Sequence, residues 1–527
     1  MRERLIELWL DSAKERSFQF PFAASLAAEG YTVLHVTRHC AMEFGKDIVA
    51  RDAKGGLHAY QLKDANGAKI TQEWWRREIE PQWAALCDSA VVHAGVTPGT
   101  PHKPWIVING ELNEEVHHLI AAKNQLRPRA RRVGVIVRGE LIDRIKSLGT
   151  SFWPESDSVD YTPLLEIFLS EGSEMFPKEK LASLLSRLVI RNKGLSKPEA
   201  KRLITSVSVL TALVLDRFQK RENHYAEFEA WIVCIASALH TAEKAKLPSG
   251  SFSQQISLLV EAALGALERL CDEIIQNEGC SQGSPFTDCK IRDVRITVIA
   301  GALSVYGMWR TIRGEPRNHR DIFIEAFTKK CISKMKIPGE CTAPAFLALA
   351  LYRGVVSAQL DKEFVLLKYL ASVISSNLGD HAFGLPNPYY SYDASLLRCM
   401  GLDEDLFKES FAGNSYSVKA FFDLLVRLNL KQRCRYFWPD YTRITQEEFV
   451  PKSPLDMYNW KSENGVIEVR MVPRRQNWET LRTAAAKSTS RGWPRMLLKD
   501  PGFVLAFCLV YPHRLNANIA RWLDSKW

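Results

Sequence analysis

The spacing of the apolar residues changes near residue 155, and this change constrains the fold more than any other feature of the chain. Before it, short β-branched or aromatic runs alternate with helical stretches, which indicates an α/β domain over residues 1–150. From about 155 to 435 the apolar residues recur at helical spacing almost throughout, as in residues 252–275, where they form one face. Residues 440–527 regain strand patterns, so we expect a small basic α/β module there.

The strand pattern of the first part is specific enough to place individual elements. A helix is expected over residues 4–29, and Asp52-Ala-Lys-Gly-Gly56 has the length and glycines of a hairpin connection between two strands. The expected strands cover residues 31–36, 47–51, 57–63, 105–109 and 132–137, and helices are expected over 71–86, 112–123 and 141–148. In the C-terminal module, residues 465–472 and 503–510 have strand-like composition.

Charge and composition restrict the classes of protein that fit. The 527 residues contain 70 Lys+Arg against 60 Asp+Glu, a net charge of +10 that favours a polyanionic partner such as DNA, RNA or acidic lipid. The eleven cysteines show no zinc-finger spacing, and no P-loop motif is present. The charged amphipathic start lacks the apolar core of a signal peptide, and no apolar run is long enough to span a bilayer, so we expect a cytoplasmic protein.

A candidate catalytic set lies in the expected hairpin. Asp47 begins one strand, and Gln61 and Lys63 lie in the next, within Tyr60-Gln-Leu-Lys63. Side-chain alternation puts Gln61 and Lys63 on one face, and antiparallel pairing would bring Asp47 near both. A carboxylate, an amide oxygen and an ammonium group are therefore expected to converge.

These residue types suit metal-dependent cleavage of a phosphodiester. A hard divalent ion polarises the phosphate and activates water, while a nearby cation stabilises the developing charge. In this hypothesis Asp47 binds Mg²⁺ (or Mn²⁺), the Gln61 carbonyl is a weaker neutral ligand, and Lys63 orients the water or stabilises the phosphate. The alternative is a surface hairpin on which Asp47 and Lys63 form a solvated ion pair.

The order of these residues resembles the Mrr-like branch of the PD-(D/E)XK nucleases. In that family a helix ending in Gly-Tyr precedes a Gly-x-Asp strand start and then Gln-x-Lys, and Gly30-Tyr31, Gly45-Lys-Asp47 and Gln61-Leu-Lys63 match this order. The resemblance covers about the first 150 residues. It implies a restriction-endonuclease-like fold and a Mg²⁺-dependent endonuclease.

Two further positions are compared with the family pattern. Phe18-Gln19 stands where the family has Phe-Glu, eleven residues before Gly30, so the helix does not offer the usual carboxylate there. Glu43, four residues before Asp47, matches an acidic position of the family and is the next candidate metal ligand.

Two arginine groups are candidate nucleic-acid contacts. From Asp440 onward there are 14 Lys+Arg and 9 Asp+Glu, and Arg474 and Arg475 lie there among tryptophans, a combination that can hold a phosphate backbone and stack bases. The alternative is a packed module with buried tryptophans and a solvated basic face. Arg127 and Arg129 either grip phosphate or belong to a solvated linker.

A nuclease joined to a long helical region favours an enzyme whose activity the rest of the chain controls. By analogy with similar nuclease halves, the expected function is a DNA-cleaving effector of bacterial defence against phage or plasmids, for example of the Lamassu type. The expected partners are DNA, a second copy of the chain on activation, and a regulatory protein of SMC-like type, with no membrane. A site-specific restriction endonuclease and an inactive helical scaffold or nucleic-acid-binding adaptor are the alternatives.

Overall fold

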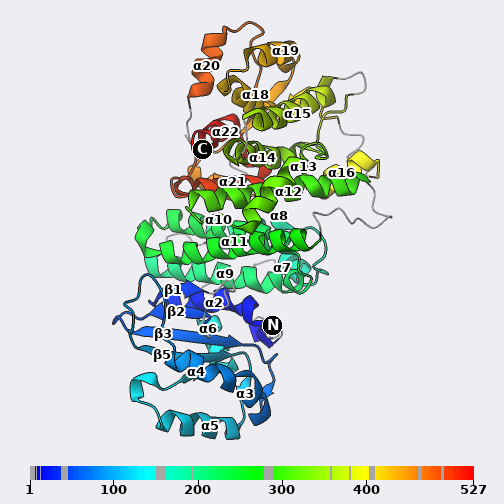
Figure 1. Ribbon diagram of the computed structural model, residues 1–527. Helices are drawn as coiled ribbons and strands as arrows, with labels where there is room; N and C mark the ends of the chain where they lie inside the picture. Colours follow the sequence, from blue (N-terminus) through cyan, green and yellow to red (C-terminus); the bar gives the residue numbers. More distant parts are fainter. Residues whose placement is uncertain are drawn as a thin grey trace. The chain divides into compact units, whose positions relative to one another are not determined.

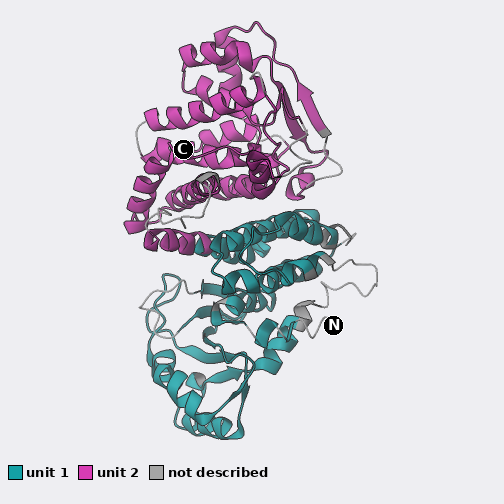
Figure 2. Ribbon diagram, turned by 90° about the vertical axis from the view of Figure 1, so that its right-hand side faces the viewer, with its two compact units in different colours: residues 1–265 teal, residues 266–527 magenta. Residues whose placement is uncertain are grey.

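The chain divides into two compact units, each described separately below (Figure 2). The first is Met1–Gly265 and the second is Ala266–Trp527, and the division falls inside helix α11 (Ser253–Gln276). The computed structural model describes residues 6–7, 9–11, 13–36, 46–149, 162–191, 195–277, 289–356, 359–378, 382–402, 410–460, 466–487 and 492–527.

The first unit contains a mixed sheet of five strands (Figure 1). The strands are β1 (Thr32–Val36), β2 (Ile48–Arg51), β3 (Leu57–Lys63), β5 (His102–Ile108) and β7 (Gly134–Ile136), in the spatial order β1-β2-β3-β5-β7. The first three strands pair antiparallel, and β3, β5 and β7 pair parallel. A short parallel pair, β4 (Lys69–Ile70) and β6 (Glu111–Leu112), lies outside this sheet.

The β2–β3 hairpin forms because its turn residues satisfy their own backbone. Asp52 Oδ1 accepts hydrogen bonds from the N–H groups of Lys54 and Gly56, each at 2.8 Å. Gly55 has φ +87°, a left-handed conformation that glycine adopts without steric cost. The hairpin fixes the register in which Ile48 pairs with Tyr60.

Helices cover both faces of the sheet. On one face α2 (Glu15–Ala28) packs on β1, β2 and β3, with Phe22 edge-on to Tyr60 at 5.4 Å between ring centroids. On the other face Leu57 and Ala59 belong to a core that includes Trp75 and Trp83. These tryptophans come from α3 (Gln72–Glu78) and α4 (Glu80–Asp88), which connect β3 to β5, while α5 (Glu114–Gln125) connects β5 to β7.

Further helices complete the first unit, and α9 and α6 among them pack against α2. They are α6 (Arg138–Gly149), α7 (Thr162–Phe168), α8 (Lys178–Arg191), α9 (Lys197–Lys220) and α10 (His224–Lys244). The α9 helix begins at a capping box between Ser196 and Glu199, and Ser17 of α2 donates a hydrogen bond to Gln219 of α9 at 2.7 Å. The α2 helix therefore lies between the sheet and α9, as Figure 1 also shows.

The second unit is largely helical and carries a small sheet of three strands. Its helices are α12 (Cys289–Ile312), α13 (His319–Cys331), α14 (Ala343–Val356), α15 (Gln359–Leu378), α16 (Tyr392–Met400), α18 (Val418–Arg427), α19 (Lys431–Tyr441), α20 (Trp478–Ala486), α21 (Pro501–Val510) and α22 (Ala517–Asp524). The strands β8 (Asn414–Ser415), β9 (Thr445–Val450) and β10 (Val466–Arg470) lie in the order β10-β9-β8. Strand β10 pairs antiparallel with β9, and β8 pairs parallel with β9.

The structure confirms the mixed sheet, the helical region and the strand at 466–470, and it corrects two local predictions. Residues 503–510, expected as a strand, belong to helix α21, where Asp500 caps the N–H of Phe503 at 3.0 Å and every residue of 503–510 is buried. When every residue of a segment is apolar, the sequence shows neither the helical nor the strand spacing of apolar and polar residues, so the two structures cannot be distinguished. The helix expected over 4–29 is interrupted, because Lys14 is extended and α2 begins at Glu15.

None of the helices in the described part of the chain is both long and apolar enough to cross a membrane.

Candidate functional site

Asp47 directly precedes β2 and is hydrogen-bonded to β3 through both its backbone and its side chain. Its N–H donates to the Tyr60 carbonyl at 2.8 Å, and its Oδ2 accepts the N–H of Leu62 at 2.6 Å. Since Ile48 is paired with Tyr60, Asp47 and Gln61 are neighbours across the two strands. The carboxylate is therefore held beside the Gln61-Leu-Lys63 segment, as the hairpin predicts.

Gln61 is buried on the side of β3 that faces α4. Its residue surface is 2% exposed, and its Nε2 donates a hydrogen bond to Gln82 Oε1. The other amide atom, Gln61 Oε1, is buried and has no hydrogen-bond partner within the described part of the chain. A buried carbonyl without a donor costs about 1–3 kcal/mol, so an electrophilic ligand at this oxygen would remove a real penalty.

Lys63, the last residue of β3, is paired with a carboxylate that the sequence interpretation did not include. Its Nζ lies 3.2 Å from Oε1 of Glu15, the first residue of α2. The Lys63 side chain is 14% exposed and that of Glu15 is 38% exposed. Burial raises the pKa of Glu15, and the Lys63 ammonium opposes that rise.

Glu15 therefore supplies a helix carboxylate at a different position from the one that the family pattern suggests. Gln19 occupies the family position, and its Nε2 donates to the backbone carbonyl of Asp47 at 3.3 Å. Glu15 precedes Gln19 by four residues, which places the two on the same face of α2. An acidic residue one turn before the expected position was the available sequence signal.

Lys46 adds a buried cation next to Asp47. Its Nζ donates to the carbonyl of Ala85 in α4 at 3.0 Å, and the residue is 4% exposed. Burial lowers the pKa of Lys46 to about 8. Two lysines thus belong to the candidate site, with Lys46 in contact with α4 and Lys63 in contact with α2.

Asp47, Gln61 and Glu15 carry oxygen donors of the kind that bind hard cations, although Gln61 faces α4 and Glu15 belongs to α2, which covers the other face of the sheet. Asp47 and Glu15 offer carboxylate oxygens, and Gln61 offers the unpartnered amide oxygen, which are ligand types that Mg²⁺ accepts while keeping several waters. No group of three or more His, Cys, Asp and Glu side chains within the described ranges could hold a metal ion. A metal here would therefore depend on the Gln61 oxygen and on water. Glu43, the other candidate ligand, lies outside the described residues.

The structure gives the four candidate nucleic-acid arginines different surroundings. Arg127 is held by Asp88 through two hydrogen bonds of 2.6 and 2.9 Å, whereas Arg129 is exposed in a 3-10 turn. Arg474 and Arg475 are exposed in the segment between β10 and α20. Arg129, Arg474 and Arg475 are therefore exposed to a large partner, whereas Arg127 would first have to break its ion pair with Asp88.

The tryptophans and arginines around Arg474 divide between surface and core. Trp493 is 6% exposed and Trp522 is 9% exposed. Arg521 is also buried, and its Nη1 lies 2.5 Å from Asp423 Oδ2. Trp493, Trp522 and Arg521 therefore belong to the interior of the C-terminal region, whereas Arg474 and Arg475 lie on its surface.

Comparison of the chain with protein-family models, curated proteins and solved structures finds no match.

Proposed function

We propose that the sheet of the first unit carries a metal-dependent endodeoxyribonuclease, a phosphodiester hydrolase that requires Mg²⁺ or Mn²⁺. The observation that carries the proposal is the meeting of three elements at one place. Asp47 is bonded to the backbone of β3 at Leu62, and Lys63, the next residue, is bonded to Glu15 of α2. The resemblance of Gly30-Tyr31, Asp47 and Gln61-Leu-Lys63 to the Mrr-like pattern supports the same chemistry.

In this proposal the residues have distinct tasks. Asp47, Glu15 and the Gln61 oxygen hold the divalent ion, which when bound supplies charge to polarise a phosphate and activate water. Lys63 stands where it can change partner from Glu15 to a phosphate oxygen, because both are anionic. Leu62 fixes the Asp47 carboxylate through its N–H, so the ligand oxygen is positioned before the ion arrives.

The wider role that we propose is a regulated effector of bacterial defence against phage or plasmids, with DNA as its substrate. A nuclease without strict sequence recognition endangers the DNA of its own cell, so its activity needs control. The helices α7 to α10 belong to the same compact unit as the sheet, and α9 packs directly on α2, the helix that bears Glu15. A displacement of α9 would therefore move α2 and change the position of Glu15, a proposed metal ligand.

Cleavage of supercoiled plasmid DNA in Mg²⁺ tests the proposal. Asp47→Ala and Lys63→Ala should each reduce cleavage by roughly 10²–10³-fold or more, the loss typical of removing a charge stabiliser in a preorganised site. Asp143→Ala on α6 and Lys54→Ala in the hairpin turn are matched controls, since both residues are exposed. Full activity of either site variant would reject the assignment.

Calorimetric measurement of Mn²⁺ binding gives a second readout that needs no activating partner. The wild-type chain should bind the ion, and Asp47→Ala should bind it at least tenfold more weakly, about 1.4 kcal/mol. A wild-type chain that neither cleaves DNA nor binds Mn²⁺ would contradict the proposed activity.

A further inference from the structure

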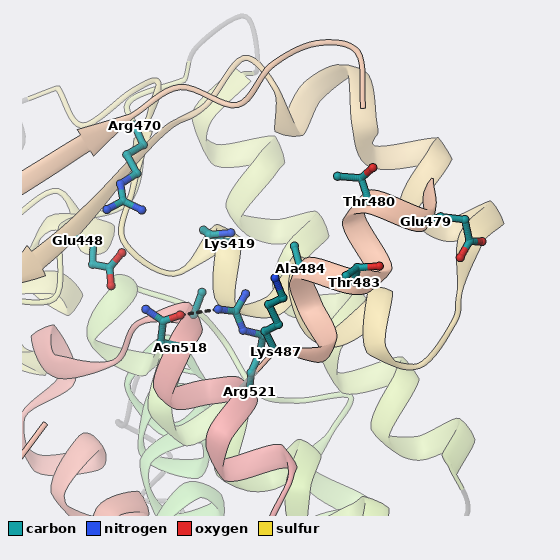
Figure 3. A pocket seen from close by; sticks show the side chains of 11 residues that line it. Lys419, Glu448, Arg470, Glu479, Thr480, Thr483, Ala484, Lys487, Asn518 and Arg521 are labelled. Atoms are coloured by element: carbon teal, nitrogen blue, oxygen red, sulfur yellow. Dashed lines mark hydrogen bonds between the residues drawn. The ribbon is translucent and has the colours of Figure 1, made fainter. Parts of the chain in front are cut away.

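A cavity in the second unit is lined by more cationic than anionic side chains. It has a volume of about 650 Å³ and lies between α18, α20, α22 and the strands β9 and β10 (Figure 3). Its charged lining consists of four cations and two carboxylates, which are Lys419, Arg470, Lys487, Arg521, Glu448 and Glu479. None of these residues belongs to the candidate nuclease site.

The positive charge is concentrated in the middle of the cavity. In Figure 3 the side chains of Lys419, Lys487 and Arg521 extend toward the same region, with Glu448 and Glu479 to either side. Lys419 and Arg521 share the carboxylate of Asp423, at 3.3 and 2.5 Å, and Arg470 pairs with Glu468. Within the described ranges Lys487 forms no ion pair with these carboxylates, so its ammonium group is the cation available to a ligand.

Arg521 has an unused donor although it is almost fully buried. The residue is 7% exposed, its Nη1 donates to Asp423 and its Nη2 donates to Asn518. Its Nε is buried and has no hydrogen-bond partner within the described ranges. Because this Nε–H has no exposed surface, a ligand would contact the guanidinium through its remaining Nη–H groups, and an anionic oxygen is the acceptor that binds guanidinium most strongly.

The start of one helix adds positive potential to the same cavity. Ala517 and Asn518, the first two residues of α22, line it. The amino-terminal end of a helix carries partial positive charge and favours an anion. The hydroxyl groups of Thr480 and Thr483 on α20 provide further polar contacts.

We infer that this cavity binds a small phosphorylated molecule of nucleotide size. Its phosphate groups would contact Arg521, Lys487 and Lys419, and Glu448 and Glu479 would accept hydrogen bonds from its hydroxyl or amino groups. The volume lies within the range of about 300–1,000 Å³ that small-molecule sites occupy. The lining contains no aromatic side chain, so the platform on which proteins stack successive bases of a single strand is absent from it.

Calorimetry of the full chain with ATP in EDTA, sodium pyrophosphate and adenosine tests the inference. ATP and pyrophosphate should both bind, and adenosine should not, because phosphate is the recognised group. Lys487→Gln should weaken binding of both phosphate compounds by about tenfold, the effect of losing one charge-assisted contact. Lys499→Gln is the matched control, since Lys499 is also exposed, lies in the same unit and does not line the cavity.

A second pair of measurements separates a ligand site from a structural role and from DNA binding. Lys487 is exposed, so Lys487→Gln should keep the wild-type unfolding temperature while it loses affinity. Asp47→Ala should bind ATP as the wild type does, which keeps this inference distinct from the nuclease proposal. The inference is overturned if neither phosphate compound binds at millimolar concentration, or if Lys487→Gln binds both as tightly as the wild type. Tighter, Lys487-dependent binding of a twelve-residue oligothymidylate would also overturn it, because the cavity would then belong to a nucleic-acid surface.

Discussion

Lys63 Nζ lies 3.2 Å from Glu15 Oε1, so the last residue of β3 is joined to the first residue of α2 across 48 positions of sequence. This ion pair puts a carboxylate of the helix next to the lysine of the hairpin. It also gives the Lys63 ammonium a partner that a phosphate could replace. Glu15 of α2 is therefore added to the candidate catalytic residues of β2 and β3.

Glu15→Gln should abolish most of the cleavage that the wild type shows in Mg²⁺. The substitution keeps the size of the side chain and removes its charge, so a metal ligand is lost while the packing of α2 remains. We expect a loss of roughly 10²-fold or more in plasmid cleavage. Glu29→Gln, at the other end of the same helix and paired with Arg144 at 2.6 Å, should leave cleavage unchanged. Equal activity of Glu15→Gln and wild type would assign Glu15 to a structural ion pair only.

Gln61→Glu and Gln61→Ala should differ in metal binding. The buried Oε1 of Gln61 has no hydrogen-bond partner among the described residues, so a carboxylate at this position can serve as a stronger ligand, whereas alanine offers none. Calorimetry with Mn²⁺ should show binding at least as tight as wild type for Gln61→Glu and weaker binding for Gln61→Ala. Identical affinities in all three proteins would remove Gln61 from the ligand set.

The sequence was sufficient to predict the hairpin and its polar residues because their placement is local. Asp52 and Gly55 define the turn, and side-chain alternation then sets the face of Gln61. The contribution of Glu15 was not predictable in the same way, because it depends on how α2 crosses the sheet. That crossing is set by contacts far apart in the sequence, such as Phe22 on Tyr60.

The C-terminal region shows a second limit of sequence patterns. Residues 503–510 are buried on all sides, so their apolar run did not distinguish helix α21 from a strand. Arg521 belongs to a buried ion pair with Asp423, whereas Arg474 and Arg475 are exposed. Burial of this kind depends on packing between α18 and α22, which the local sequence does not reveal.

Glu340 should make the stability of the second unit depend on pH. It is 1% exposed, and burial raises its pKa from the ordinary 4.5 to about 7, although the N–H groups of Tyr416 and Ser417 donate to its Oε2 at 2.7 and 3.2 Å. Between pH 4.5 and 7 the folded chain holds a proton that the unfolded chain has released. Stability therefore falls as pH rises through this window, and the loss is complete above pH 7.

Glu340→Gln removes this titration and keeps an acceptor oxygen for the two N–H groups. A shift of this size corresponds to roughly 3 kcal/mol, so the variant should be more stable than wild type at pH 8 by up to that amount, and the advantage should be smaller at pH 5. Urea unfolding of both proteins at the two pH values measures it. A stability difference that does not change with pH would show that Glu340 does not titrate in this range.

Reversing the charge of Arg474 and Arg475 should weaken DNA binding if this segment contacts phosphates. Both side chains are exposed, and the Arg474 carbonyl accepts a hydrogen bond from Trp438 Nε1 at 2.8 Å, which anchors the backbone at this position. The slope of log affinity against log salt concentration should fall by about one unit for each lost contact. Lys329→Glu with Lys330→Glu, an exposed basic pair on α13, is the control. An unchanged slope would favour a packed module with a solvated basic face.

Double-strand cleavage should depend on the assembly of at least two chains. One set of Asp47, Gln61 and Lys63 cuts one strand, so a break in both strands needs a second set, which a second copy of the chain would provide. We therefore expect nicked plasmid at low protein concentration and linear plasmid to rise more steeply than the first power of concentration. Light scattering on the same samples should show the increase in mass that accompanies linear product. A mixture of wild type with an excess of Lys63→Ala chains should shift the product toward nicked plasmid, because most pairs would then contain one inactive site. Linear product that forms in direct proportion to the concentration of a strictly monomeric chain, and that the Lys63→Ala chains do not diminish, would contradict this prediction and require both cuts to be made by one site.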